Sequence, residues 1–475
     1  MPKIAMIGAG SIVFAKTLFK DICATPALRD SEFRFMSRTT TKLERLKAYA
    51  DRVIAENSLK ATAMITTDRR EALKDADFVI AMLQIGGVEA FEADYTVPLK
   101  HGVDQCIGDT LGPGGIFRAL RTIPEMLSIA ADMKELCPNA VMLNYVNPMA
   151  AVCWGLGTVP GLQYVGLCHG VQTTLDLIAG YLGVPKQEID YLSAGINHMG
   201  WFLKMSHKGR DLYPRFKELC EKPEYYINEK VRIEVMRHFG YFMTESTGHL
   251  SEYVPWFRTS AEGMGRYCDE PSFGGETGAY FKWCRLIADQ LESVDMLADE
   301  SAVLDGRSVE YCSYILEALT TGIPFKFQGN VRNEGYITNL PMGCCVEVPV
   351  FADKMGLHPT FVGALPSQCA ALNLTNVNVQ GLSVEAAVSG DPELVVAACA
   401  LDPLTSACLT LKQVRDMVAD MLEAEKQWLP QFAGKALRPT PHIDTPPGTA
   451  HASVPLDPAL AVVHRFGELA RKASS

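Results

Sequence analysis

Short apolar runs with the composition of buried strands alternate with helix-length segments over the first 190 residues. This alternation constrains the fold more than any other feature, because parallel strands joined by helices form βαβ units. Strands are expected at residues 3–7, 32–36, 77–83, 140–145 and 163–167, and helices at 12–23, 41–55 and 118–136. We therefore predict an α/β fold whose first domain, residues 1–190, is a Rossmann-like doubly wound sheet.

The pattern becomes less regular beyond Gly195. Helices are expected near 227–239, 279–297, 308–320, 384–401 and 411–428, and strands near 324–327 and 344–350. We predict that residues 191–475 form an α+β domain for substrate binding and oligomerisation. Five prolines between residues 437 and 456 predict that this domain ends in an extended tail.

A glycine loop, Gly8-Ala9-Gly10-Ser11, directly follows the first strand. Glycines at these positions let the backbone turn tightly and approach a pyrophosphate at the N-terminus of the next helix. The third position of the fingerprint is Val13 rather than glycine, so a simple strand–helix turn is an alternative. The position after the first strand favours a dinucleotide site that includes Gly8, Gly10 and Ser11.

The second strand ends without the acidic residue that usually binds the ribose hydroxyls of NAD. Ser37 and Arg38 follow it instead, and this pair could accept the 2′-phosphate of NADP. Alternatively, Arg38 belongs only to a solvent-exposed loop. We also predict cofactor contacts for Gln84 and Asn147.

Cys168 and His169 follow the strand at 163–167, at the edge where doubly wound sheets place their ligands. His198 comes thirty residues later. A thiolate and an imidazole can bind a borderline divalent cation. Their spacing matches no recognised zinc pattern, however, so a buried cysteine and a hydrogen-bonded core histidine are the alternative.

Two further polar segments follow predicted strands or precede helices. One places Asp109 before a glycine-rich run that ends at Arg118, and the other places Asn144 and Asn147 at the end of a buried strand. These groups could hydrogen-bond sugar hydroxyls. A glycine-rich turn and a helix N-cap are the alternatives.

Composition limits the partners of the chain. The formal net charge is -11, which gives no electrostatic attraction for nucleic acid. No apolar run is long enough to cross a bilayer, and the first residues lack the features of a signal peptide. Fourteen cysteines without a CxxC pair indicate reduced thiols. We therefore expect a cytoplasmic protein with neither a nucleic-acid nor a membrane partner.

A set of motifs extends over nearly the whole chain. They are GAGS at 8–11, DTLGPGGIFRALRTIP at 109–124, NYVNPM at 144–149, GLCHGVQ at 166–172, AGINHM at 194–199, YFMTES at 241–246, EYVPWF at 252–257 and GNVRN, NLP and CCVEVP between 329 and 349. Together they resemble the NAD- and divalent-metal-dependent glycosidases of glycoside hydrolase family four. Within that family the chain is most similar to the melibiose-type α-galactosidases.

The resemblance implies hydrolysis through transient oxidation, an exception to the usual pair of carboxylates. The nicotinamide takes hydride from C3 of the sugar, a base removes the C2 proton, and the glycosidic oxygen leaves C1. Water then adds and the hydride returns. A divalent cation such as Mn²⁺ stabilises the enolate, with Cys168 and His198 as its ligands. The resemblance favours NAD, and Ser37 and Arg38 leave NADP open.

The resemblance also implies roles for other side chains. Asp109 would assist the leaving group, and His169 could share that role. Asn147 and Asn197 would contact the substrate.

The base that removes the C2 proton would be a tyrosine. Tyr241 and Tyr253 are the candidates, with Glu245 and His249 nearby. Taken singly, either tyrosine is more often a core or interface aromatic.

Gly170 bears on the choice of substrate. Galactosidase relatives typically have serine after the Cys-His pair, whereas α-glucuronidase relatives have glycine. A missing side chain would make room beside the sugar, so an α-glucuronidase is the alternative to an α-galactosidase.

A net NAD(P)-dependent sugar dehydrogenase and a catalytically silent nucleotide sensor are alternatives from other classes. The family resemblance further implies a small carbohydrate substrate and a homodimer or homotetramer.

Overall fold

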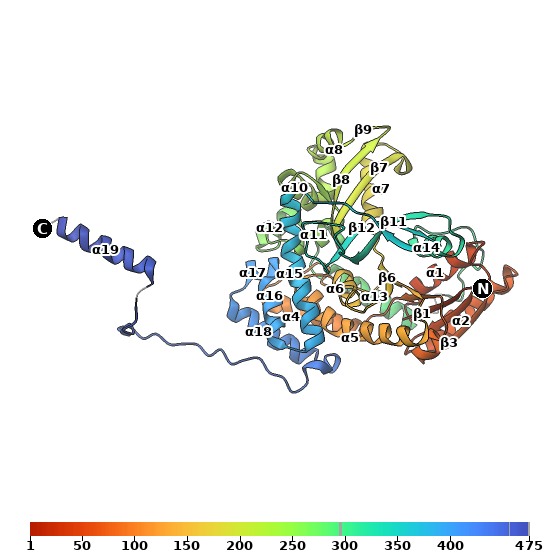
Figure 1. The fold of residues 1–475 in the computed structure, drawn as a ribbon, viewed down its shortest axis with the longest axis horizontal. Helices are drawn as coiled ribbons and strands as arrows, with labels where there is room; N and C mark the ends of the chain where they lie inside the picture. Colours follow the sequence, from red (N-terminus) through yellow and green to blue (C-terminus); the bar gives the residue numbers. More distant parts are fainter. Residues whose placement is uncertain (294–296, 456, 474–475) are drawn as a thin grey trace. The chain divides into compact units, whose positions relative to one another are not determined.

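A computed structural model describes residues 1–293, 297–455 and 457–473. It contains two compact units, residues 1–436 and 437–475. In the first unit the described strands form one sheet, which has a parallel half and an antiparallel half. Figure 1 shows this sheet with helices on both sides. The predicted α/β class, with a doubly wound sheet followed by an α+β region, is confirmed.

One half of the sheet is parallel, in the order β3-β2-β1-β4-β5-β6. Its strands are β1 (Lys3–Ile7), β2 (Glu32–Met36), β3 (Thr62–Thr66), β4 (Phe78–Ala81), β5 (Val141–Asn144) and β6 (Gln163–Gly166). Five of them match predicted strands to within two residues at each end. β3 was missed: its sequence, TAMIT, is half-buried or exposed rather than a continuous apolar run.

The helices of this half lie between successive parallel strands, except the last, which leads from β6 to the antiparallel half. They are α1 (Ile12–Ala24), α2 (Thr40–Glu56), α3 (Arg69–Leu73), α4 (Gly87–Lys100), α5 (Gly112–Leu136), α6 (Met149–Leu156) and α7 (Gly170–Leu182). α5 begins before the predicted residue 118, because the glycine-rich run after Leu111 already forms its first turn. Pro113 is compatible with that turn because the first helical amides need no intrahelical acceptor.

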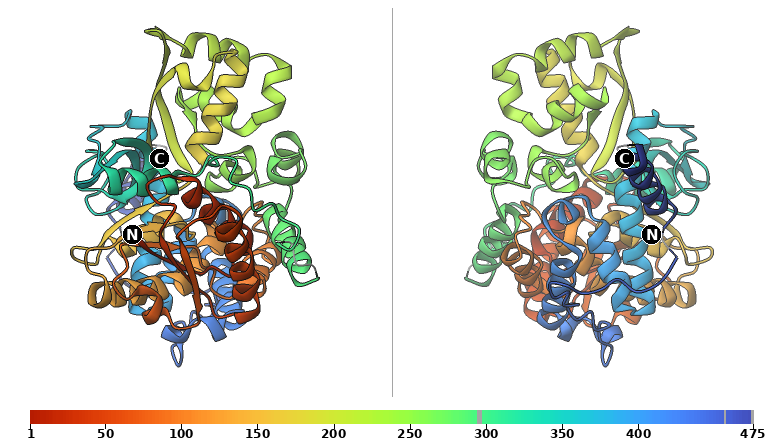
Figure 2. Two further views of the ribbon diagram at one scale, coloured as in Figure 1. Left: turned by 90° about the vertical axis from the view of Figure 1, so that its right-hand side faces the viewer. Right: turned by 90° about the vertical axis from the view of Figure 1, so that its left-hand side faces the viewer.

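The other half of the sheet is antiparallel. β11 (Phe325–Arg332) pairs with β6 and with β12 (Cys345–Asp353), which continues to the hairpin of β7 (Ile189–Ile196) and β8 (Met199–His207). Short strands at its margins are β9 (Arg210–Asp211), β10 (Phe242–Met243) and β13 (Gly356–Pro359). Figure 2 shows the hairpin standing out from the rest of the unit, with α7 and α8 (Tyr213–Cys220) beside it.

The remaining helices of this unit pack on both halves of the sheet, several of them against α4 and α5. They are α8 (Tyr213–Cys220), α9 (Pro223–Tyr226), α10 (Lys230–Phe239), α11 (Thr247–Tyr253), α12 (Ala261–Tyr267), α13 (Ala279–Ser293), α14 (Tyr311–Thr321), α15 (Ser367–Ser389), α16 (Pro392–Leu401), α17 (Pro403–Cys408) and α18 (Leu411–Ala424). The single helix predicted at 384–401 is wrong, because Gly390 ends α15 with a left-handed backbone. Residues 294–296 of the helix predicted at 279–297 lie outside the described residues.

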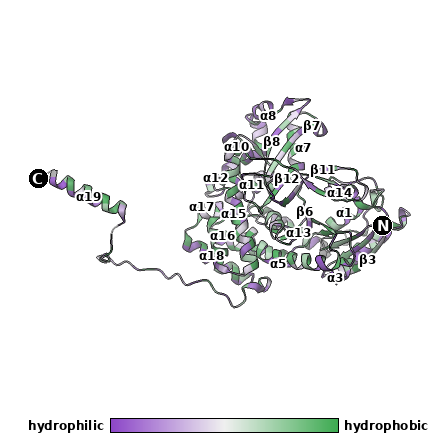
Figure 3. Cartoon of the chain, viewed as in Figure 1, coloured by the Kyte–Doolittle hydropathy of each residue, from purple (hydrophilic) through white to green (hydrophobic). Residues whose placement is uncertain are grey.

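A continuous hydrophobic core joins the two halves. It contains Phe19 and Phe33 from the parallel half together with Trp201 and Val346 from the antiparallel half. Figure 3 shows hydrophilic stretches on outer helices such as α3 and α8. The sheet and the hydrophobic core both include residues on each side of residue 190. The division into domains at 1–190 and 191–475 therefore stays a prediction.

The second unit begins at Leu437. Residues 437–455 form no helix or strand, as expected for the proline-rich tail. The tail ends in α19 (Pro458–Ala473), which was not predicted. Among the described residues, no helix is both long and apolar enough to cross a lipid bilayer.

Candidate active site

The glycine loop connects β1 to α1 and is supported by the end of β2. The amides of Gly8 and Ala9 both donate to the carbonyl of Met36, at 2.9 Å. Gly8 has a φ of +92°, and a Cβ there would lie 2.8 Å from the backbone of Leu83. A side chain is therefore excluded on two grounds. Ser11 is exposed just before α1, as a dinucleotide loop requires.

The other predicted cofactor residues lie around this loop or farther along the same sheet edge. The Ser37 hydroxyl lies against Gly10, 2.5 Å from where a Cβ would be. Arg38 is exposed and lies 3.5 Å from Glu125. Gln84 follows β4 and donates to the carbonyl of Gly87.

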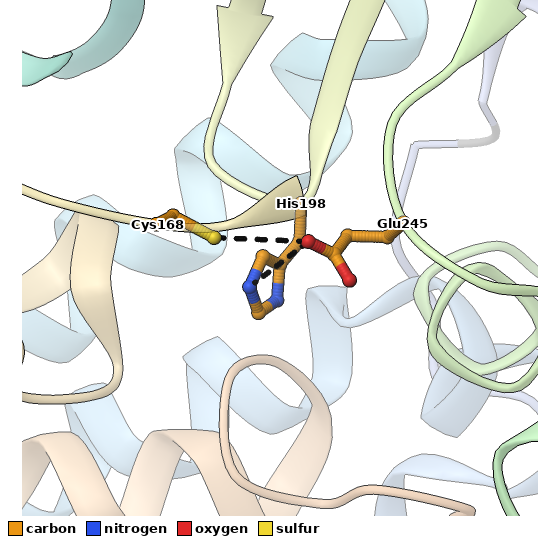
Figure 4. A group of neighbouring side chains, drawn as sticks. All are labelled: Cys168, His198 and Glu245. Carbon is orange, nitrogen blue, oxygen red and sulfur yellow. Dashed lines mark hydrogen bonds and ion pairs between the residues drawn. The ribbon is translucent and has the colours of Figure 1, made fainter. Parts of the chain in front are cut away.

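Cys168, His198 and Glu245 form a compact cluster at the carboxyl end of β6 (Figure 4). One potential ligand atom from each lies within 4.8 Å of the others. The Glu245 Oε1 atom is 3.7 Å from the Cys168 sulfur and 3.5 Å from His198 Nε2. Cys168 and His198, which the sequence suggested as ligands of one cation, therefore lie close together in the fold. The structure adds a carboxylate that the sequence placed only nearby.

Backbone geometry directs two of these side chains into the cluster. His198 lies in the two-residue turn between β7 and β8 and has a φ of 62°. Glu245 follows β10 and has a φ of 74°. Left-handed backbone is uncommon for residues other than glycine and is concentrated at functional sites. Two of the three cluster residues therefore adopt a backbone conformation that is unfavourable for residues other than glycine.

The donor set suits a borderline divalent cation. A thiolate sulfur and an imidazole nitrogen suit Zn²⁺ and similar cations, and the carboxylate oxygen also suits Mn²⁺. Burial, with the carboxylates of Glu245 and Glu347, raises the pKa of the Cys168 thiol. Although burial acts in the opposite direction, His198, His249 and Arg232 lower the pKa of Glu245. A cation in the cluster would supply the positive charge that the thiolate form needs.

Gly170 accounts for the space that Glu245 occupies. A Cβ at position 170 would overlap Glu245 Oε1 and lie 2.9 Å from Glu245 Cδ. The space expected beside Gly170 is therefore filled by a carboxylate. A carboxylate there disfavours an anionic sugar group at the same place.

Asp109 lies in a network of buried polar groups. It accepts hydrogen bonds from Thr110 Oγ1 at 2.7 Å and Asn147 Nδ2 at 3.0 Å, and Arg118 is 3.7 Å away. Two nitrogens of Arg118 have no hydrogen-bond partner, and neither does the side-chain amide of the buried Asn197. Such unsatisfied groups are costly unless a ligand binds them.

The loop before Asp109 is fixed by one buried carboxylate. Glu252 accepts hydrogen bonds from the amides of Cys106, Ile107 and Gly108, at 2.7, 2.9 and 2.9 Å. Burial nevertheless raises the pKa of Glu252 to about 7. This positioning role could not be read from sequence because 144 residues separate Gly108 from Glu252.

His169 turns away from the cluster towards α14. Its Nε2 atom lies 2.7 Å from Glu310 Oε1, and this hydrogen bond raises the pKa of His169. The imidazole is partly exposed and stacks at 6.5 Å on the ring of Tyr145. A protonated imidazole held in this way could act as an acid.

The two candidate tyrosines differ in their surroundings. The hydroxyl of Tyr253 is 3.2 Å from His198 Nδ1, and the residue is fully buried. Tyr241 instead packs edge-on against Tyr213, in a hydrophobic cluster beside β8. Of the two tyrosines, only Tyr253 has a hydrogen bond to the cluster of Cys168, His198 and Glu245 among the described interactions.

Two further ionisable residues near the cluster were not assigned a role from sequence. His249 lies 3.8 Å from Glu245 Oε2, and burial lowers its pKa. Glu347 on β12 is buried, and its pKa is raised to about 8 by burial and by Glu245. Its register partner in β7 is Gly195. The sequence motif CCVEVP contains Glu347. Only the fold shows that this residue lies near Glu245.

Comparison with known proteins is consistent with this geometry. The chain is 41% identical over 442 residues to the α-galactosidase of Rhizobium meliloti, covering 91% of this chain and 90% of the relative. It is 38% identical over 439 residues to the α-galactosidase of Bacillus subtilis, covering 91% and 100%. It is 31% identical to an α-galacturonidase of Thermoanaerobacterium saccharolyticum, covering 77% and 83%.

Solved structures share the fold. A putative glucosidase, lplD, from Bacillus subtilis has a TM-score of 0.76 at 26% identity, covering 89% of this chain and 100% of that one. A 6-phospho-α-glucosidase from gut microorganisms, solved with NAD and Mn²⁺, has a TM-score of 0.72 at 21% identity, covering 90% and 99%. The Family 4 glycosyl hydrolase model matches residues 3–184, and the model of the C-terminal domain of that family matches residues 193–405. The chain belongs to glycosyl hydrolase family 4.

Proposed function

We propose that the protein is an α-galactosidase that requires a nicotinamide dinucleotide and a divalent cation such as Mn²⁺. The observation that carries the proposal is the cluster of Cys168, His198 and Glu245 at the same edge of the sheet as the glycine loop. Two relatives at 41% and 38% identity are α-galactosidases, and a structural relative was solved with NAD and Mn²⁺.

The residues of the cluster would hold the cation through one sulfur, one nitrogen and one oxygen. When bound, the cation supplies Lewis acidity, and the nicotinamide supplies a reversible hydride acceptor. Tyr253 fixes the imidazole plane of His198 through its hydrogen bond to Nδ1. Cys168 must stay reduced to serve as a ligand.

The predicted acid–base roles are proposed in part. Asp109 and Asn147 are hydrogen-bonded to each other and would orient the sugar and the leaving group. His169, whose pKa is raised by its hydrogen bond to Glu310, would donate a proton to the departing oxygen. Of the two tyrosines, Tyr253 is the better placed to act near C2, because Tyr241 packs against Tyr213.

Location and assembly are also proposed. All fourteen cysteines are free thiols, which supports a reducing, cytoplasmic setting. The exposed side chains of Trp283 and Leu286 on α13 support a homodimer or homotetramer, because apolar patches on a surface often mark contacts between copies. Light scattering on the purified chain would give the mass directly.

The test is a set of assays with nitrophenyl α-galactoside, in which cofactor, Mn²⁺ and thiol reductant are each omitted in turn. Hydrolysis should need all three and should produce no net reduced cofactor. Activity that persists in chelator without cofactor would contradict the proposal. Accumulation of reduced cofactor in proportion to substrate would instead indicate a net sugar dehydrogenase.

An α-uronidase is the second candidate. The relative at 31% identity is an α-galacturonidase, and Gly170 was the position expected to admit a sugar carboxylate. The carboxylate of Glu245 in that space favours the neutral sugar. Parallel assays with nitrophenyl α-glucuronide and α-galacturonide decide between them: faster hydrolysis of either uronide would select this candidate.

A further inference from the structure

The end of β2 departs from the pattern of NAD-binding sheets. Residues 36–42 read Met-Ser-Arg-Thr-Thr-Thr-Lys and contain neither aspartate nor glutamate. An acid at this point binds the two ribose hydroxyls of NAD and repels a 2′-phosphate, whereas a nearby arginine accommodates it. The charge at this position is therefore the reverse of the one that selects NAD.

Ser37 occupies the position where that acid would stand. Its hydroxyl lies 2.5 Å from the Cβ position of Gly10, so it faces the glycine loop directly. The loop itself is supported by the carbonyl of Met36, the residue before Ser37. A ribose bound over Gly10 would therefore meet a short neutral donor rather than a carboxylate.

Two cationic side chains flank Ser37. Arg38 is 76% exposed, and its ion pair with Glu125 is long, at 3.5 Å. Glu125 is held more closely by Arg69, at 2.9 Å, so its charge is already compensated. Lys42 Cδ lies 3.9 Å from the Cβ position of Gly10, and Lys42 has no ion pair within the described residues. Exposed pairs such as the one between Arg38 and Glu125 are weak, so a phosphate can displace them.

The first turn of α2 adds backbone donors at the same place. α2 begins at Thr40 and has 17 residues, with no acid in its first turn and no side-chain hydrogen bond from Thr39 to cap it. The first amides of a helix lack intrahelical acceptors and favour an anion. These amides support the basic side chains, whose placement beside the glycine loop carries the argument.

We propose that Ser37, Arg38, Lys42 and the first turn of α2 form a binding site for the 2′-phosphate of NADP(H). The chain then binds NADP(H) more tightly than NAD(H). This inference rests on the proposed function only in that a nicotinamide dinucleotide must occupy the glycine loop. It concerns which dinucleotide that is.

The test measures binding rather than turnover. The full chain is freed of copurified nucleotide, and NADPH and NADH are titrated by fluorescence, with 2′,5′-ADP and 5′-AMP titrated by calorimetry. NADPH should bind at least tenfold more tightly than NADH, and 2′,5′-ADP more tightly than 5′-AMP. Equal or tighter binding of NADH would overturn the 2′-phosphate site and leave the proposed function standing. Failure of both reduced cofactors to bind would overturn both proposals.

Variants locate the effect on the proposed groups. Arg38→Ala should weaken NADPH about tenfold and change NADH by less than threefold, and Ser37→Asp should reverse the preference. Lys47→Ala is the matched control, because Lys47 is on the same helix but pairs with Asp51. Should Arg38→Ala leave the ratio of the two dissociation constants unchanged, or Lys47→Ala change it as much, the assignment would be wrong. Circular dichroism of each variant verifies that it is folded.

Discussion

The two halves of the sheet contribute to the site in different ways. The parallel half supplies the glycine loop, Ser37 and Cys168, which all follow directly from the carboxyl ends of strands. The antiparallel half supplies His198 from a hairpin turn and Glu245 from the segment after a two-residue strand. In a parallel sheet, ligand-binding residues generally follow the carboxyl ends of the strands. In the antiparallel half, their positions depend instead on particular backbone conformations. Variants that change residues of one half at a time can show whether the proposed cation site needs both halves.

The largest expected effect comes from removing a proposed metal ligand of either half. Cys168→Ala and His198→Ala should each reduce hydrolysis by about 1,000-fold or more, because a Lewis acid contributes several kcal/mol to the transition state. Steady-state rates and binding of Mn²⁺ by electron paramagnetic resonance are the measurements. Melting temperatures check that both variants fold. Full Mn²⁺ binding by Cys168→Ala would show that the parallel half contributes no ligand.

The parallel half is also the part that the sequence predicts best. Its strands are apolar runs bounded by helices, so five of six strands and the glycine loop are apparent from local pattern. The sequence also identified Cys168 and His198. It could not establish that Glu245 joins them, because that contact depends on the turn after β10 and on the space at Gly170. Glu252 and Glu347 act across long sequence separations, which local pattern does not encode.

The next effect separates Glu245 from the other two cluster residues. Glu245→Gln should weaken Mn²⁺ binding by about 10- to 100-fold, since it keeps the shape of the side chain but removes its charge. Gly170→Ala should produce a similar loss, because the added Cβ displaces Glu245. Calorimetric titration of Mn²⁺ measures both.

The double variant tests whether the two residues act together. If Gly170→Ala acts only through Glu245, the combined loss should be close to that of Glu245→Gln alone. Additive losses would mean that Gly170 affects the site by another route. Glu270→Gln, at an exposed carboxylate, is the control.

A smaller effect tests how His198 is held. Tyr253→Phe removes the hydroxyl 3.2 Å from His198 Nδ1 and should weaken Mn²⁺ binding about tenfold, the lower end for a group that orients a ligand. If Tyr253 is also the base at C2, turnover at saturating Mn²⁺ should fall at least 100-fold as well. Tyr241→Phe should leave Mn²⁺ affinity as it is, because Tyr241 packs against Tyr213.

The smallest effect concerns the charge buried in the antiparallel half. The pKa of Glu347 is about 8, above its ordinary value, because of burial and the nearby Glu245. The folded protein therefore holds this proton more tightly than the unfolded chain does. The resulting stability is complete below about pH 4.5 and is lost progressively as the pH rises from there through 8.

Glu347→Gln should remove this part of the pH dependence. Melting of the chelator-treated protein between pH 5 and 9 should show a shallower decline for the variant, while Glu44→Gln, at an exposed site, should follow the parent protein. Glu252 and Asp402, with pKa values raised to about 7 and about 6, should keep a residual slope below pH 7. Because parent and variant both keep these two groups, their slopes should differ most between about pH 5.5 and 7.5, where Glu347 is protonated in the folded protein and ionised in the unfolded chain. An identical slope there would mean that Glu347 is ionised in the folded protein and that its charge is compensated within the antiparallel half.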